Sequence, residues 1–250
     1  MRNNIIYIIL LSVVIACSSD ADESVDETLA NASLLLSDFI ENEDIQIDNV
    51  IACASGSLNP NEIVAYVYPR PGTTDIRYFE TETANVPNND YTLYTQINLP
   101  ELGLFNGFLR RFVRQTDEEK WVIITFREGG EIHLSNPIRL RHLTRNTIFS
   151  QEVGIDQETS TMPRFNWPNL VQQEDAIYFQ AITDASDEFL SGTYTFDPTW
   201  QYYNLDNVVL NITEETPPDL IVGDGYSITL MGVSEDNWVN FFEQSSFITQ

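Results

Sequence analysis

The sequence is poor in positive charge and in sulfur. It has 12 Lys and Arg residues against 38 Asp and Glu residues among 250, and Lys120 is its one lysine. Nucleic-acid binding requires clustered Lys and Arg to meet phosphates, so a net charge of -26 argues against that class of partner. The 2 cysteines, Cys17 and Cys53, are too few for a disulfide framework.

Residues and motifs typical of catalysis are also scarce. Only His133 and His142 are available for imidazole chemistry, and the chain lacks a Gly-x-Ser-x-Gly elbow, a His-Glu-x-x-His motif and a phosphate-binding glycine loop. We therefore predict that the protein is not an enzyme and uses no cofactor. A carboxylate pair for glycoside hydrolysis stays open, because among 38 acids some pair lies at a workable distance.

The N-terminus reads as a cleaved leader. Arg2 precedes an apolar run from Ile5 to Ala16, and as a helix this run covers about 18 Å, too little for a hydrocarbon core of roughly 30 Å. Val14-Ile15-Ala16-Cys17 resembles the lipobox of bacterial lipoproteins. The resemblance implies cleavage after Ala16 and acylation of Cys17, which would attach the protein stably to a membrane. An ordinary secretory signal that contains a cysteine is the alternative.

The segment after Cys17 is strongly acidic. Residues 20–48 contain ten acids and no base, which predicts a solvated tether over 17–48, with a short amphipathic helix between Asp26 and Glu41. Ser18-Ser19-Asp20-Ala21-Asp22-Glu23 resembles the export signal of Bacteroidota-type surface lipoproteins. That resemblance implies anchoring in the outer membrane, on the cell surface. A plain spacer in a periplasmic lipoprotein is the alternative.

The remainder predicts an all-β protein. Short runs rich in aromatic and β-branched residues, such as 63–68 and 121–126, alternate with turn signals such as Pro87-Asn88-Asn89-Asp90 and Gly129-Gly130. Residues 49–150 hold ten bases and eleven acids, whereas 151–250 hold one base and seventeen acids. We therefore expect two tandem β-sandwich domains, 49–148 and 149–250, joined near 144–161.

Motifs in the second half resemble a fibronectin type III domain. Trp167 matches the core tryptophan of the second strand, Tyr178 fits the third strand, and Leu220, Gly223 and Tyr226 match the Leu-x-x-Gly-x-x-Tyr corner. The resemblance implies that the Tyr226 hydroxyl bonds to the backbone upstream. A long segment from 182 to 208 predicts an inserted hairpin or loop. The first half resembles an immunoglobulin-like or fibronectin-like sandwich more weakly, through its final hairpin at 121–140.

The aromatic residues of the insertion are candidate ligand-binding groups. Trp200, Tyr202 and Tyr203 lie beside polar residues, and exposed rings would stack on sugar C–H faces, so we single them out for glycan binding. The alternative is that they are core residues, as aromatics in β proteins commonly are.

Other candidates favour structural interpretations. Cys53 lies in an apolar string and is predicted to be a small core residue. Acidic residues gather in two loops, but neither matches a dense calcium loop, so we predict no metal; these are Asp184, Asp187 and Glu188, and Asp224, Glu235 and Asp236. Two arginine clusters would meet an anionic glycan, the acidic second domain or a solvated sheet face; these are Arg110, Arg111 and Arg114, and Arg139, Arg141 and Arg145.

Together these observations predict a binding or accessory protein of the cell envelope. It would be anchored to the outer membrane through its N-terminal lipid and would capture a glycan or a partner protein. A purely architectural module that binds no small ligand is the alternative, and a glycan-active enzyme is a third.

Overall fold

The computed structural model describes residues 34–149, 153–168 and 175–250. The leader, the cleavage site and Cys17 lie outside the described residues. The described residues belong to one compact unit of the chain, Ser33–Gln250. Within the described ranges no helix is both long and apolar enough to cross a membrane.

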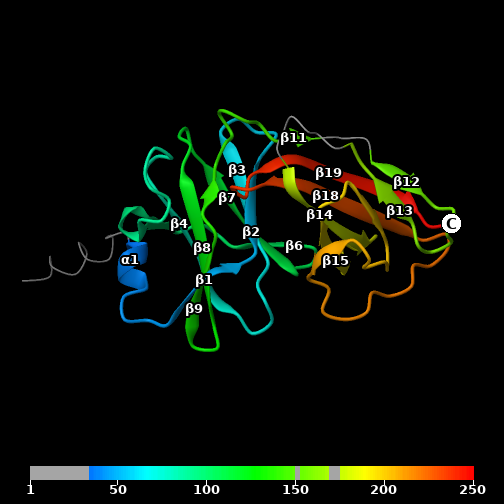
Figure 1. Ribbon diagram of the computed structural model, residues 1–250, viewed down its shortest axis with the longest axis horizontal. Helices are drawn as coiled ribbons and strands as arrows, with labels where there is room; N and C mark the ends of the chain where they lie inside the picture. The colour runs from blue at the N-terminus through cyan, green and yellow to red at the C-terminus, as the bar shows by residue number, and fades with distance from the viewer. Residues whose placement is uncertain (1–33, 150–152, 169–174) are drawn as a thin grey trace, which may run out of the picture. The chain divides into compact units, whose positions relative to one another are not determined.

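The first half of the described chain forms a β-sandwich of two sheets (Figure 1). The first sheet has the strand order β1-β9-β8-β4-β5, with β10 also paired to β8. The second has the order β2-β3-β7-β6. The strands are β1 (Ile45–Val50), β2 (Ala52–Gly56), β3 (Glu62–Val67), β4 (Thr74–Glu80), β5 (Thr95–Ile97), β6 (Leu102–Leu104), β7 (Leu109–Gln115), β8 (Trp121–Glu128), β9 (Glu131–Ser135) and β10 (Ile138–Arg139).

The second half forms another sandwich, so the predicted tandem β-sandwich architecture is confirmed. Its large sheet has the order β11-β19-β18-β14-β15-β17, and its small sheet the order β12-β13-β16. The strands are β11 (Ile148–Phe149), β12 (Gly154–Asp156), β13 (Arg164–Asn166), β14 (Asp175–Asp184), β15 (Phe189–Thr195), β16 (Thr199–Gln201), β17 (Val208–Asn211), β18 (Gly225–Ser234) and β19 (Val239–Ile248).

Each sandwich has its own core because successive side chains of a strand point to opposite faces of the sheet. In β3, Ile63, Ala65 and Val67 turn toward the first sheet and pack with Tyr78 and Phe126. In the second sandwich, buried residues of both sheets meet across the interior. Its main members are Phe165, Trp167, Tyr178, Ile182, Trp200, Ile228, Leu230, Phe241 and Phe247.

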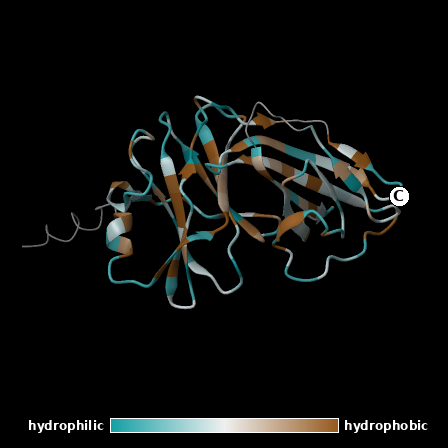
Figure 2. Ribbon diagram, in the orientation of Figure 1, coloured by the Kyte–Doolittle hydropathy of each residue, from teal (hydrophilic) through white to brown (hydrophobic). Residues whose placement is uncertain are grey.

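A third core joins the two sandwiches. The other face of β3 presents Val64 and Tyr66, which pack against Phe179 of β14 and Met231 of β18. In Figure 2, hydrophobic and hydrophilic segments alternate along β18 and β19. This is expected because parts of these strands pack in the cores and other parts face solvent. Thr147, in the predicted interdomain segment, accepts the amide of Gly56 and donates to the Val239 carbonyl. The two sandwiches therefore share an apolar interface.

The turn between β18 and β19 extends this junction into the first sandwich. Trp238 is fully buried in the first core although it belongs to the second half of the chain. Its indole Nε1 donates to the Arg145 carbonyl at 2.9 Å. The neighbouring backbone is also held, since Ala54 N donates to the Asn237 carbonyl at 3.0 Å and Arg139 N to the Asp236 carbonyl at 2.9 Å.

The folded part begins inside the segment that the sequence places in the tether. Helix α1 (Leu36–Phe39) buries Leu36 and Phe39 against the outer face of the first sheet, with Phe79, Ile123 and Ile132. Strand β1 pairs in parallel with β9. The expected helix is thus observed only over its last turn, and the rest of its predicted range up to residue 33 lies outside the described residues.

The corner motif of the second sandwich has the expected geometry. The Tyr226 hydroxyl accepts the backbone N–H of Ile221 at 3.0 Å. Leu220 is buried beside it, and Trp167 packs edge-on against Tyr178 with ring centroids 5.4 Å apart. The predicted roles of Trp167, Tyr178 and Tyr226 in this core are therefore confirmed.

A buried carboxylate in the first sandwich makes its stability depend on pH. Glu80 is 3% exposed and bonds to Arg114 through both oxygens, at 2.9 and 3.0 Å, and to Lys120 Nζ at 3.0 Å. Burial alone would raise the pKa of Glu80, but the two cations outweigh it and hold the pKa below its ordinary value of 4.5. Ionised Glu80 therefore stabilises the fold above that value, and the stabilisation is lost as the pH falls through the lowered pKa.

We expect Glu80→Gln to lower the free energy of unfolding at neutral pH by about 2 kcal/mol, because it removes the partner of two half-buried cations. The variant should also lose less stability than the parent between about pH 5 and pH 3. Denaturant unfolding at several pH values measures both. The exposed neighbour Glu82 offers a matched control, and equal effects of Glu80→Gln and Glu82→Gln would contradict the assignment.

Candidate functional site

The structure corrects the prediction that Trp200, Tyr202 and Tyr203 form an exposed stacking platform. Trp200 is 2% exposed and Tyr202 is fully buried. The rings are also not coplanar, since Trp200 and Tyr202 meet at 77° and Tyr202 and Tyr203 at 87°. These three aromatics pack at the second core, so they offer no flat surface to a sugar.

Local pairing explains why these rings turn inward. β16 pairs with β13, which places Trp200 opposite Phe165, and the two rings stack with centroids 5.8 Å apart. The Tyr202 hydroxyl donates to the Pro218 carbonyl at 2.7 Å, and the Tyr203 hydroxyl donates to the Pro217 carbonyl. The hydroxyls therefore tie the insertion to the segment that precedes β18.

The arginine clusters bind carboxylates of the same chain. Arg110 pairs with Glu101 at 2.6 Å and Arg114 with Glu80. Arg141 forms an ion pair with Asp236 of the second sandwich, so one arginine does meet the acidic domain, as one of the alternatives proposed. These pairs involve three of the six arginines in the two clusters.

Cys53 packs among apolar side chains, and His133 lies beside an arginine. Cys53 packs in the third core, and burial raises the pKa of its thiol to about 12, which leaves no thiolate for chemistry. His133 Nδ1 lies 3.0 Å from Arg70 Nη2, while the Arg70 guanidinium also bonds to Glu128. The predicted structural role of Cys53 agrees with this packing.

The carboxylates of the first acidic loop accept hydrogen bonds from other groups of this chain. Asp184 Oδ1 accepts the amides of Ser186 and Glu188 at 2.8 and 2.9 Å, and these bonds hold the pKa of Asp184 below its ordinary value. Glu188 in turn accepts from Asn106 of the first sandwich at 3.0 Å. In the part of the chain that the structure describes, no group of three His, Cys, Asp or Glu residues is placed to hold a metal ion.

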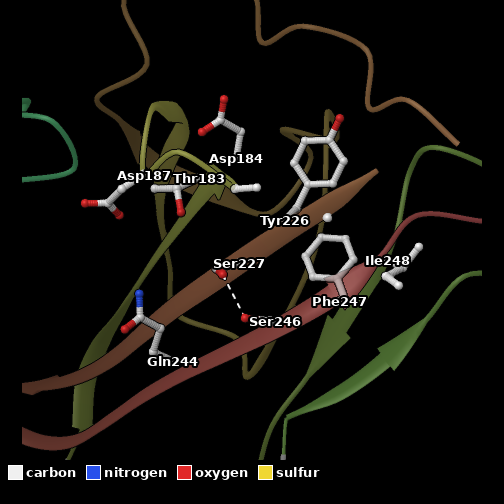
Figure 3. A pocket seen from close by; sticks show the side chains of 11 residues that line it. Thr183, Asp184, Asp187, Tyr226, Ser227, Gln244, Ser246, Phe247 and Ile248 are labelled. Carbon is white, nitrogen blue, oxygen red and sulfur yellow. Dashed lines mark hydrogen bonds between the residues drawn. The ribbon is translucent and has the colours of Figure 1, made fainter. Parts of the chain in front are cut away.

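The site that sequence reasoning missed is a groove at the free end of the large sheet of the second sandwich. We call it the distal groove; it has a volume of about 440 Å³. Figure 3 shows Ser227 and Ser246 joined across neighbouring strands, with Asp184 at the end of β14 and Asp187 on the turn that follows. Its lining residues are Thr183, Asp184, Ala185, Asp187, Gly225, Tyr226, Ser227, Gln244, Ser246, Phe247 and Ile248.

The groove exists because β14 and β19 extend beyond the third core, which covers only part of each strand. On the face toward the first sandwich, β14 carries Phe179 and Ala181, which are buried in the third core, and then Thr183 at the groove. The same change occurs along β19, from Phe242 in the third core to Gln244 and Ser246. This switch from apolar to polar along one face is the sequence signal that could have located the groove.

A second hollow of about 530 Å³ adjoins the distal groove and shares Asp184 and Tyr226 with it. It adds Asp219 and Asp224, and its rim includes Ile221, which is 61% exposed. Hydroxyls, an amide, carboxylates and exposed aliphatic groups therefore lie together at this end. Such a surface can hydrogen-bond a polar ligand and contact an apolar one.

One hollow brings acidic side chains together, since Asp175, Glu235 and Asp236 line it with Arg141 and Arg145. Burial raises the pKa of Asp175, and Asp236 is paired with Arg141. The described carboxyls Glu43, Glu62, Glu80, Glu128 and Asp184 have lowered pKa values.

Comparison with known proteins gives a weak structural likeness. No protein-family model and no curated protein matches the sequence. Among solved structures, the chain is similar to fibronectin domains FN1–FN3 of chicken CNTN1, with a TM-score of 0.29 and 9% sequence identity. The alignment covers 83% of this chain and 65% of that one, just under two thirds of its length.

Proposed function

We propose that this protein is a lipid-anchored accessory protein of a bacterial cell envelope, held at the outer membrane by acyl chains on Cys17 and exposed at the cell surface. The support is the sequence of the leader, in which an apolar run too short to span a bilayer ends in Val14-Ile15-Ala16-Cys17. The acids that follow Cys17 keep the tether solvated and hold the folded unit away from the membrane.

We further propose that the anchored unit captures a glycan or a partner protein at the distal groove. The observation that carries this proposal is the groove itself, a hollow of about 440 Å³ lined by Ser227, Gln244 and Ser246 and bordered by Asp187. These side chains can donate and accept hydrogen bonds. Binding rather than catalysis is the role that fits, because the groove has no histidine and no cysteine among its lining residues, and Asp184 already accepts two backbone amides.

An architectural role is the second candidate, and the third core favours it. Because Tyr66, Phe179 and Met231 pack between the sandwiches, the two sandwiches form one compact, stiff body and are not joined only by a flexible linker. A stiff body would space or support another envelope protein without binding a small ligand.

A substitution that fills the groove separates the two roles. Ser246→Trp adds an indole at an exposed position within the groove, and we expect it to reduce binding of the captured ligand at least 10-fold. The assay applies the detergent-solubilised full chain to glycan and peptide arrays and measures the affinity for the hits. Leu58→Trp adds the same indole at a position that is 83% exposed on the first sandwich.

The control variant should bind as the parent does. If neither array yields a ligand, or if Ser246→Trp and Leu58→Trp behave alike, capture at this groove is contradicted and the architectural role stands.

A further inference from the structure

An uncharged apolar run lies on the edge strand β17. Residues 207–213, Asn-Val-Val-Leu-Asn-Ile-Thr, contain no charged residue and no proline in a chain that has 38 acids. Val209 is 47% exposed and Leu210 is 42% exposed. Exposed edge strands normally carry charges or proline, because an apolar edge pairs readily with another strand.

One side of β17 is open within the described residues. β17 ends the strand order of its sheet and pairs with β15, where Asn211 lies opposite Thr193 and Leu210 opposite Tyr194. Of the strands that the structure describes, none pairs with the other side of β17. The backbone groups along that side form a template for a further strand.

The other described edges are protected. The pairing of β1 is interrupted where Asp48 adopts a positive φ of 55°. β5 is bridged by Leu35, and β2 is covered by the β18–β19 turn, since Ala54 N donates to the Asn237 carbonyl. The remaining edges are short: β6, β12 and β16 have three residues each, and β10 and β11 have two each. The four-residue β17 is thus the longest edge among those described that lacks such protection.

Further apolar side chains surround this edge. Phe196, which is 65% exposed, follows directly after Thr195, the residue that pairs with Val208. Leu205 is 55% exposed, and its carbonyl accepts the amide of Val208. The apolar rim of Phe196, Leu205, Val209 and Leu210 offers contacts for the side chains of an added strand.

Charge identifies the kind of strand that fits. Acids flank the edge strand on both sides, with Asp197 and Asp206 before it and Glu214 and Glu215 after it. Residues 151–250 hold seventeen acids and only Arg164 as a base. A second copy would bring the same negative charges to the edge, and a four-residue strand supplies too little surface for the roughly 1,000 Å² that a stable dimer buries.

We propose that the β17 edge binds an extended segment of another protein by strand addition. The segment carries apolar or β-branched residues in its centre and Lys or Arg at its ends. Backbone hydrogen bonds hold it to β17, the rim contacts its side chains, and the flanking carboxylates attract its cationic ends. This inference is independent of the distal groove.

A synthetic peptide, Lys-Val-Thr-Val-Thr-Val-Lys, tests the proposal on the detergent-solubilised full chain. Peptide binding should slow amide hydrogen exchange of residues 207–213. The double variant Val209→Lys, Leu210→Lys should weaken binding at least 10-fold, because it solvates the edge and repels the cationic peptide. Both positions are already exposed, so the fold should tolerate the change.

Two controls separate strand addition from charge attraction. The double variant Leu58→Lys, Leu143→Lys changes the net charge by the same amount at positions of the first sandwich that are 83% and 54% exposed, and it should bind as the parent does. A peptide with alternate amides N-methylated keeps its charge but cannot complete the ladder, and it should not bind.

Three results would overturn the proposal. These are unchanged exchange of residues 207–213 at millimolar peptide, equal binding of the N-methylated peptide, and equal weakening by the control variant. A dimer in analytical ultracentrifugation that the Val209→Lys, Leu210→Lys variant abolishes would also overturn it, because the occupant would then be a second copy.

Discussion

The Trp238→Ala variant is expected to unfold with a free energy about 4 kcal/mol lower than that of the parent protein. Trp238 is fully buried, packs in the first core and donates its indole N–H to the Arg145 carbonyl at 2.9 Å. Truncation leaves a large cavity and an unpaired carbonyl. Because Trp238 belongs to the β18–β19 turn of the second sandwich and packs in the first core, the variant should destabilise both sandwiches.

Denaturant unfolding followed by amide hydrogen exchange in β8 and β14 measures the effect on each sandwich. Both sets of amides should lose protection in one transition, because the third core couples the sandwiches through Tyr66, Phe179 and Met231. Phe196→Ala is the matched aromatic control, since Phe196 is 65% exposed, and it should change stability by less than about 0.5 kcal/mol. Two separate transitions, or loss of protection in β14 alone, would contradict a shared core.

The second large effect is expected for Cys17→Ser, which should abolish membrane attachment. The serine variant cannot carry a thioether-linked lipid, and the described residues include no helix able to span a bilayer. Without acyl chains nothing in the proposed account keeps the protein at the membrane. Cells grown with radioactive palmitate and then fractionated should yield labelled parent protein in the membrane fraction and unlabelled variant outside it.

Cys53→Ser controls for the second cysteine. Burial raises the pKa of the Cys53 thiol to about 12, so this side chain should take up no label and its replacement should leave the label on the protein. If the Cys17→Ser variant still sediments with membranes, attachment depends on another part of the molecule.

The second sandwich could be predicted from short-range motifs. The corner bond joins Tyr226 to Ile221, only five residues away, and the spacing of Leu220, Gly223 and Tyr226 encodes it directly. Trp167 likewise lies in the core as the resemblance implied. Features of this kind depend on nearby residues, which a sequence displays side by side.

The inward orientation of Trp200 could not be predicted in the same way. Thr199-Trp200-Gln201 reads as a half-buried strand, but alternation does not tell which face is covered. The face is set by pairing with β13, thirty-odd residues earlier, which places Trp200 against Phe165. The start of the fold was missed for a similar reason, because β1 is exposed along most of its length and is held by parallel pairing with β9.

The fusion of the sandwiches did leave a signal in the sequence. Residues 63–68 are apolar at every position, Ile-Val-Ala-Tyr-Val-Tyr, whereas a strand with one solvated face alternates. In the structure Ile63 and Ala65 face the first core while Val64 and Tyr66 face the third. Continuous apolar strands therefore mark sheets that are covered on both faces.

The mass of the mature N-terminus tests the central claim of a lipid-anchored envelope protein most directly. Protein purified from the membrane fraction should yield an N-terminal peptide that begins at Cys17 and carries the mass of attached acyl chains. A peptide that begins at Met1, or one that begins after Ala16 without added lipid mass, would contradict the anchor and the function proposed from it.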